Sequence, residues 1–130
     1  MIPWIDKYIG IPYKKWGRSI KGVDCYGLVY LVCKNELGRE DLPEFLGDYD
    51  DKESIKDLIS KNIPLLAGDP TDIPDVGDIA VFNFCNMPIH MAVYVGRGRV
   101  LHTLLKSETC VESISSVRLK GRLHGYYKLR

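Results

Sequence analysis

The 130-residue chain lacks a strong excess of either charge, a long apolar run and a large set of cysteines. Lys and Arg number 18 against 17 Asp and Glu, so the basic footprint of a nucleic-acid binder is absent. No stretch is long enough to span a bilayer, which predicts no membrane insertion. Four cysteines are too few for a disulfide-dense scaffold, although one or two bridges stay open.

Metal-binding and export signals are also missing. The chain contains neither Cys-x-x-Cys nor His-Glu-x-x-His, so we expect no structural zinc site. The first residues, 1–6, have no basic start, no apolar segment and no small-residue cleavage site. Three expectations follow: the protein stays in the cytoplasm, another component carries it out, or a leader was removed before this sequence begins.

Composition predicts one domain over residues 1–130, because 45% hydrophobic and 27% charged residues suit a single soluble core. Helical patterns come first and strand patterns follow, which predicts an α+β fold with N-terminal helices packed on a C-terminal antiparallel sheet. The expected helices are Ile2–Ile9, Cys25–Leu37 and Lys52–Lys61, and the expected strands are Ile79–Phe84, Met91–Val95, Arg99–Leu104, Cys110–Ser113 and Tyr126–Leu129. Residues 62–78, rich in Pro and Gly, are expected to form a long connection.

Cys25 is the candidate nucleophile. It follows Asp24, a good helix N-cap, and so opens the clearest helix of the chain. The partial positive charge of a helix N-terminus favours thiolate over thiol. The alternative is a buried structural cysteine, a description that fits Cys33 in the middle of the same helix better.

His90 and His102 are the candidate base and orienting residue. If residues 96–98 form a three-residue hairpin loop in which Val95 pairs with Arg99, both histidines share one face of the sheet and meet diagonally. A two-residue loop would break this parity. Taken singly, each histidine is better explained as an ordinary strand residue.

Together these residues predict acyl transfer by a thiol. His90 would take the Cys25 proton and return it to the leaving nitrogen, while His102 fixes the tautomer of His90. The backbone N–H of Cys25 would donate to the oxyanion. Because thiol and imidazole suffice for this chemistry, no cofactor is expected.

Five segments carry a family resemblance. They are residues 12–13, 23–29, 76–82, 90–96 and 101–103, which read PY, VDCYGLV, VGDIAVF, HMAVYVG and LHT. Together they resemble the NlpC family of papain-like cysteine peptidases, in the order Cys, His, His. The resemblance implies a papain-like fold and hydrolysis of peptidoglycan stem peptides, typically between γ-D-glutamate and a diamino acid.

The resemblance also implies two substrate-binding residues. A tyrosine at the place of Tyr13 lies over the active site in relatives, and an aspartate at the place of Asp24 holds the free amine of the substrate. The alternatives are a packed loop aromatic for Tyr13 and simple helix capping for Asp24.

The sequence departs from the family pattern at Tyr26, where Ser is usual, and at Val76, where Pro is usual. With that aromatic, residues 36–49 resemble the tail-associated branch found in bacteriophages. This branch implies tail-tip proteins as partners and a protein made in the host cytoplasm and delivered to the wall by the virion. The alternatives are an amidase, acyltransferase or tail-protein protease of the same fold, and a non-catalytic tail module.

Overall fold

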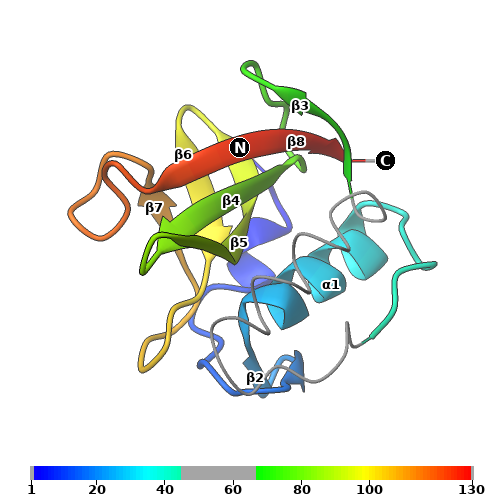
Figure 1. Ribbon diagram of the computed structural model, residues 1–130. Coiled ribbons are helices and arrows are strands. Elements are labelled where there is room, and N and C mark those ends of the chain that lie inside the picture. The colour runs from blue at the N-terminus through cyan, green and yellow to red at the C-terminus, as the bar shows by residue number, and fades with distance from the viewer. Residues whose placement is uncertain (1, 45–66, 130) are drawn as a thin grey trace.

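The computed structural model describes residues 2–44 and 67–129, drawn in colour in Figure 1. Its main feature is an antiparallel six-stranded sheet with one α-helix, α1 (Cys25–Glu36), lying against it. In spatial order the strands are β3 (Ala67–Thr71), β8 (Leu123–Leu129), β4 (Ile79–Phe84), β5 (Met87–Gly96), β6 (Arg99–His102) and β7 (Cys110–Ser113). A short hairpin, β1 (Arg18–Ser19) and β2 (Gly22–Val23), precedes α1.

The sheet buries apolar residues on both faces, as the two-residue period of a strand requires. Its α1 face presents Val81, Met91 and Val93, which pack with Leu28 and Val32 of the helix. A second cluster fills the other face: Ala80, Phe82, Ala92, Val100 and, from the segment after β7, Leu119. Each fully buried side chain of this size contributes roughly 1.5–3 kcal/mol, so α1 is firmly held on β5.

The expected N-terminal helix over residues 2–9 is wrong. Among the described residues this region holds only η1 (Ile5–Lys7), a single 3₁₀ turn. So short a segment gains little from helix propagation, and its side chains instead dock on the end of α1. Lys7 and the hydroxyl of Tyr8 both hydrogen-bond Glu36, at 3.0 and 3.1 Å. The expected helix at Lys52–Lys61 lies outside the described residues.

Five of the six strands of the large sheet were predicted, two of them with the right bounds. β4 and β7 have the expected bounds. β5 begins at Met87 instead of Met91, β6 ends at His102 instead of Leu104, and β8 begins at Leu123 instead of Tyr126. β3 lies inside the expected connection, and Pro70 within it is tolerated because β3 is an edge strand paired only with β8.

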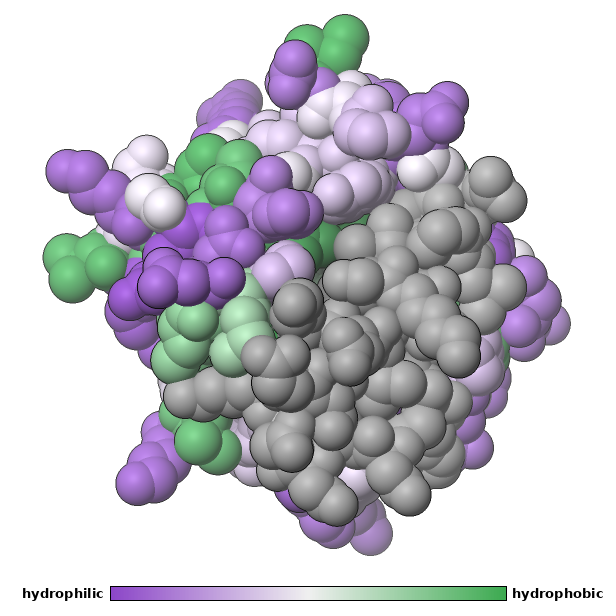
Figure 2. All heavy atoms as spheres, viewed as in Figure 1, coloured by the Kyte–Doolittle hydropathy of each residue, from purple (hydrophilic) through white to green (hydrophobic). Residues whose placement is uncertain are grey.

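No helix within residues 2–44 and 67–129 is long and apolar enough to cross a membrane. On the face shown in Figure 2, outside the grey atoms, hydrophilic residues dominate and hydrophobic residues appear in small separate groups. All four cysteines lie in the described ranges and none forms a disulfide, so the bridges that the sequence left open are not formed.

Candidate active site

The start of α1 is fixed by Asp24, which is only 2% exposed. Its carboxylate caps the helix by accepting from the N–H of Gly27 at 2.7 Å. The same carboxylate accepts from the N–H of Trp16 at 3.0 Å and from Arg18 Nη1 at 2.8 Å. The loop before the helix is thereby tied to its first turn, which sets the position of Cys25.

Gly27 permits this loop to cross the first helical turn at close range. A Cβ at this position would overlap the carbonyl oxygen of Gly17 and lie 2.8 Å from Arg18 Nη1. The helix therefore needs glycine here, despite its poor intrinsic propensity. Tyr26, the departure from the family pattern, is buried, and its hydroxyl donates to the carbonyl of Pro43 at 2.6 Å. It anchors the segment after α1 rather than facing a substrate.

The structure brings His90 and His102 together, although by a different turn from the one expected. Gly96 pairs with Arg99, so the β5–β6 loop has two residues, and a bulge at Val95 restores the parity that such a loop would break. His90 Nε2 lies 2.9 Å from His102 Nδ1. Both residues are buried, at 5% and 0% exposure.

Cys25 contacts β5 at Met91, the residue that follows His90. The β5–β6 ladder stops at the pair Val93 and Leu101, and further along β5 the backbone N–H of Met91 hydrogen-bonds the Cys25 sulfur. Tyr26 provides a second backbone hydrogen bond to this sulfur. Cys25 is mostly enclosed, with part of its surface accessible. The start of α1 therefore contacts β5 at the residue next in sequence to His90.

The electrostatics favour a neutral pair in the resting protein. Burial raises the pKa of Cys25 to about 11, and the charge of Asp24 adds to it, while the two backbone hydrogen bonds and Arg18 oppose the shift. Burial lowers the pKa of His90 to about 3, with a further contribution from His102. The expected preference for thiolate is therefore reversed, because desolvation outweighs the helix N-terminus.

Alkylation of Cys25 is accordingly expected to be slow at pH 7 and to rise steeply toward pH 11, because only the thiolate reacts and its folded-state pKa is raised. The measurement is the iodoacetamide rate as a function of pH, made in a Cys85→Ala background since Cys85 is exposed. A rate that is already level between pH 5 and pH 8 would instead demonstrate a preformed thiolate–imidazolium pair.

Sequence reasoning missed Glu112. Its Oε1 lies 2.9 Å from His102 Nε2, so the relay runs from His90 through His102 to a carboxylate. Glu112 stands two residues beyond Cys110, the register partner of His102, and so reaches His102 diagonally. The expected strand 110–113 contained this carboxylate, but the β6–β7 register needed to place it was not assigned.

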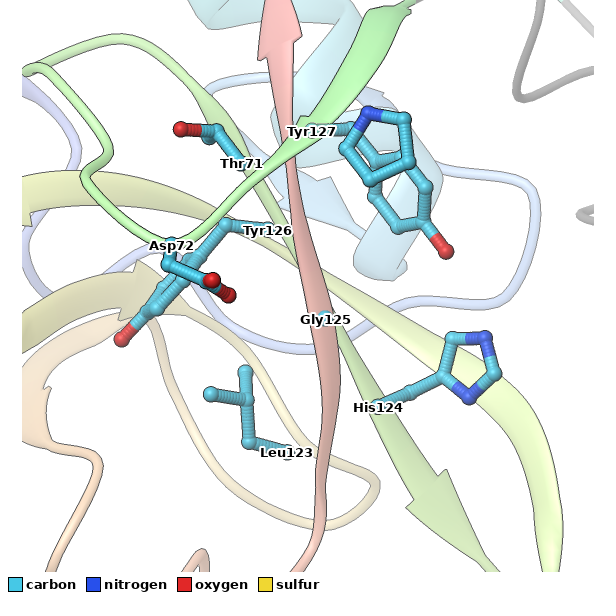
Figure 3. Close-up of a pocket in the computed structure, with 8 residues that line it drawn as sticks. Thr71, Asp72, Leu123, His124, Gly125, Tyr126 and Tyr127 are labelled. Carbon is cyan, nitrogen blue, oxygen red and sulfur yellow. The ribbon is translucent and has the colours of Figure 1, made fainter.

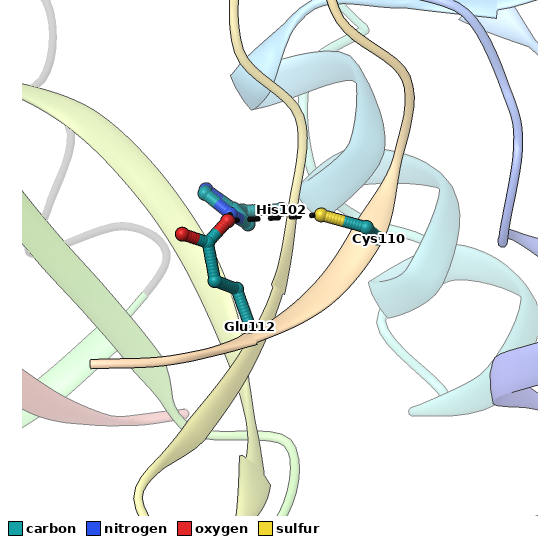
Figure 4. A group of neighbouring side chains, drawn as sticks. All are labelled: His102, Cys110 and Glu112. Carbon is teal, nitrogen blue, oxygen red and sulfur yellow. Dashed lines mark hydrogen bonds and ion pairs between the residues drawn. The ribbon is translucent and has the colours of Figure 1, made fainter. Parts of the chain in front are cut away.

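His102, Cys110 and Glu112 form the cluster in Figure 4, and their potential ligand atoms lie within 4.8 Å of one another. The guanidinium of Arg118 already contacts this cluster. Its Nη2 lies 2.5 Å from Glu112 Oε1 and 3.5 Å from Cys110 Sγ. A metal ion would have to displace this cation and break the His102–Glu112 bond. We therefore describe the cluster as an ion-pair network rather than a metal centre.

Tyr13 lies close to the thiol. Burial raises the pKa of Tyr13 to about 12, and the charges of Cys25 and Asp24 raise it further. Such charge interactions act over short distances, so the Tyr13 hydroxyl lies near both groups. Both carboxylate oxygens of Asp24 are already engaged by the protein, so capping accounts for its contacts. The assignment of either residue to substrate stays a prediction.

A separate hollow of about 410 Å³ lies between β3 and β8 (Figure 3). The polar residues that line it are Thr71, Asp72, His124, Tyr126 and Tyr127. None of Cys25, His90 and His102 lines it. Because it holds no predicted site residue, we do not place the reaction there.

Comparison with solved structures defines the class of fold. The NlpC/p60 domain of the peptidoglycan hydrolase SagA superposes with a TM-score of 0.67 at 22% identity, covering 98% of this chain and 94% of that one. An NlpC/P60 family protein from Bacillus cereus superposes with a TM-score of 0.72 at 20% identity, covering 98% of this chain and 38% of that one. The fold is thus the papain-like fold of NlpC/P60 domains.

The family follows from the sequence itself. The NlpC/P60 family model matches residues 10–127, so the chain belongs to the NlpC/P60 family. Among curated proteins it is 25% identical over 121 residues to the murein DD-endopeptidase MepS/murein LD-carboxypeptidase of Escherichia coli K12. That alignment covers 91% of this chain and 57% of the relative, so the chain spans little more than half the length of the relative.

Proposed function

We propose that this protein is a cysteine peptidase that hydrolyses stem peptides of peptidoglycan, with Cys25 as nucleophile. The observation that carries the proposal is the junction of α1 with β5, where the Cys25 sulfur accepts from the backbone N–H of Met91, the residue that follows His90, and His90 hydrogen-bonds His102. MepS is named as a murein peptidase and SagA as a peptidoglycan hydrolase, which supports the substrate class.

The reaction starts from the neutral pair. As Cys25 Sγ attacks the scissile carbonyl carbon, its proton passes to His90, and the tetrahedral oxyanion is met by backbone N–H groups near the start of α1. His90 returns the proton to the leaving amine, the C–N bond breaks and a thioester remains on Cys25. Water, deprotonated by His90, then hydrolyses the thioester, releasing a carboxylic acid and the free thiol.

The scissile bond in this proposal joins γ-D-glutamate to the diamino acid. A free amine at the start of the stem peptide would approach the Tyr13 side of the site, where the Tyr13 hydroxyl lies near Cys25. Asp24 contributes negative charge there even while it caps α1. These two residues are the proposed determinants of substrate position.

The substrate class is tested with purified cell-wall sacculi and, in parallel, denatured casein. The proposal predicts soluble muropeptides and new amino groups from sacculi, and no fragments from casein. Cleavage of casein alone would identify a protease for protein substrates. Release of intact stem peptides from the glycan would identify an amidase of the same fold.

We place this activity at a bacteriophage tail tip. The support is the likeness of residues 36–49 to the tail-associated branch, together with the aromatic Tyr26 after the nucleophile; residues 45–49 lie outside the described part. Purified virions of the encoding phage, probed with an antibody to the protein, should carry it in the tail fraction. Detection only in the lysate, never in particles, would contradict this placement.

A further inference from the structure

We infer that Glu112 is a positioning residue that fixes the tautomers of His102 and His90, so that Nδ1 of His90 is the basic nitrogen. Its consequence for catalysis rests on the proposed function, in which His90 is the base. The inference adds which nitrogen of His90 takes the proton. Its own foundation is the chain of contacts from Glu112 to His102 at 2.9 Å and from His102 to His90 at 2.9 Å.

The direction of these hydrogen bonds follows from the carboxylate. An ionised carboxylate only accepts, so His102 Nε2 must carry a hydrogen and donate to Glu112. In a neutral imidazole the other nitrogen is then an acceptor, so His102 Nδ1 accepts from His90 Nε2. By the same rule His90 Nδ1 has a free lone pair. Because Glu112 accepts at one end of the relay, His90 donates to His102 through Nε2. The lone pair of His90 therefore lies on Nδ1.

Glu112 is kept ionised by its neighbours. Burial opposes this, but hydrogen bonds from Arg118, Ser116 and His102 outweigh burial and hold the pKa of Glu112 at about 2. Arg118 reaches Oε1 through Nη2 at 2.5 Å and through Nε at 3.1 Å, and Ser116 donates to Oε2. The remaining titratable group at Glu112 is Cys110, whose pKa burial raises and which therefore stays a neutral thiol.

Aromatic side chains around His90 restrict the orientation of its ring. Phe82 and Phe84 pack around its ring, with centroids 5.9 and 5.5 Å away, and the second ring stands edge-on. Arg122 covers the outer face of Phe84 at 4.5 Å. An apolar cage of this kind holds the ring orientation, so the tautomer is decided by the bond to His102.

The first test is Glu112→Leu. Glu112 Oε1 faces both His102 Nε2 and Arg118 Nη2, so a glutamine would keep its oxygen at this position, whereas leucine removes the acceptor altogether. His102 Nε2 then has no carboxylate to donate to, and we expect imidazole ¹⁵N spectra to show part of His90 protonated on Nδ1 instead of Nε2. On a stem peptide we expect kcat to fall about 100-fold with KM unchanged, by analogy with the loss from a wrong tautomer in other triads. Glu112→Asp, which keeps the carboxylate, should restore most of this loss.

The matched control is Glu108→Leu, the same change at an exposed residue outside the relay. It should leave both the ¹⁵N spectra and kcat as in wild type. Unchanged His90 tautomers in Glu112→Leu would overturn the inference, even if kcat fell, because the loss would then be structural. If stem peptides are not cleaved by wild type, the proposed function fails, while a changed tautomer in Glu112→Leu would still uphold the positioning role.

A second variant tests the inference without altering Glu112. In Arg118→Gln the main hydrogen bond that lowers the pKa of Glu112 is lost, so its pKa should rise from about 2 toward the ordinary 4.5. Protonated Glu112 donates, and the Nε2–H tautomer of His90 should therefore be lost at higher pH than in wild type. An identical pH dependence of the His90 ¹⁵N signals in the two proteins would contradict the role of Glu112.

Discussion

Replacing Cys25 by Ala is expected to abolish stem-peptide hydrolysis, with kcat/KM lower by on the order of 10⁴-fold or more. The variant removes the only protein atom in the proposed mechanism that bonds covalently to the scissile carbonyl carbon. Folding should survive, because the cap contacts of Asp24 with Gly27 and Trp16 involve no Cys25 atom. The measurement pairs initial hydrolysis rates with the thermal unfolding midpoint.

Cys85→Ala is the matched control for this prediction. Cys85 is also outside any disulfide, but it is exposed in the β4–β5 turn, where its φ is 54°. Its loss should leave the hydrolysis rate within a factor of two of wild type. Persistent hydrolysis in Cys25→Ala would remove Cys25 from the mechanism and favour a non-catalytic role for this thiol.

Gly27→Ala is expected to destabilise the fold by at least about 2 kcal/mol, although Ala is the better helix former by about 1 kcal/mol. The added methyl group would overlap the Gly17 carbonyl oxygen and crowd Arg18 Nη1, so the loop must move away from α1. The free energy of unfolding, from urea titration, measures the effect. Hydrolysis should fall as well, because the same loop holds the start of the nucleophile helix.

Gly125→Ala provides the comparison, since the three atoms nearest to a Cβ at that position are side-chain atoms of Tyr127 at 3.6 to 3.7 Å. Such a distance is an ordinary contact, so the free energy of unfolding should change by less than about 0.5 kcal/mol. Equal losses in the two variants would mean that the approach of Gly17 to Gly27 has no special cost.

The helix that carries the proposed nucleophile was predictable because its signals are local. Asp24 before the helix and Gly38 beyond it mark the ends, and α1 runs from Cys25 to Glu36. The apolar residues of β4 were equally clear, and its bounds are as expected. Edge strand β3 was not predictable from the local sequence, because proline is unusual in a strand. Residues 67–71 form a strand through their pairing with β8.

The hydrogen-bonded relay from His90 through His102 to Glu112 could be predicted only in part from the strand register. His90 and His102 were placed on one face by parity, and that parity survives only because the Val95 bulge compensates for the shorter turn. To predict that Glu112 lies near His102, one must know the β6–β7 register, which pairs His102 with Cys110. No local sequence pattern specified that register. The pKa of Cys25 was also beyond the sequence, since it depends on how deeply the finished fold encloses the sulfur.

The most direct test of the account is one digest of a defined stem tetrapeptide, L-Ala-γ-D-Glu-meso-diaminopimelate-D-Ala, followed by mass spectrometry. The account predicts two products from the wild-type protein, L-Ala-D-Glu and diaminopimelate-D-Ala, and an intact substrate with His90→Ala. Intact tetrapeptide after incubation with folded wild-type protein, or identical products from His90→Ala, would contradict it.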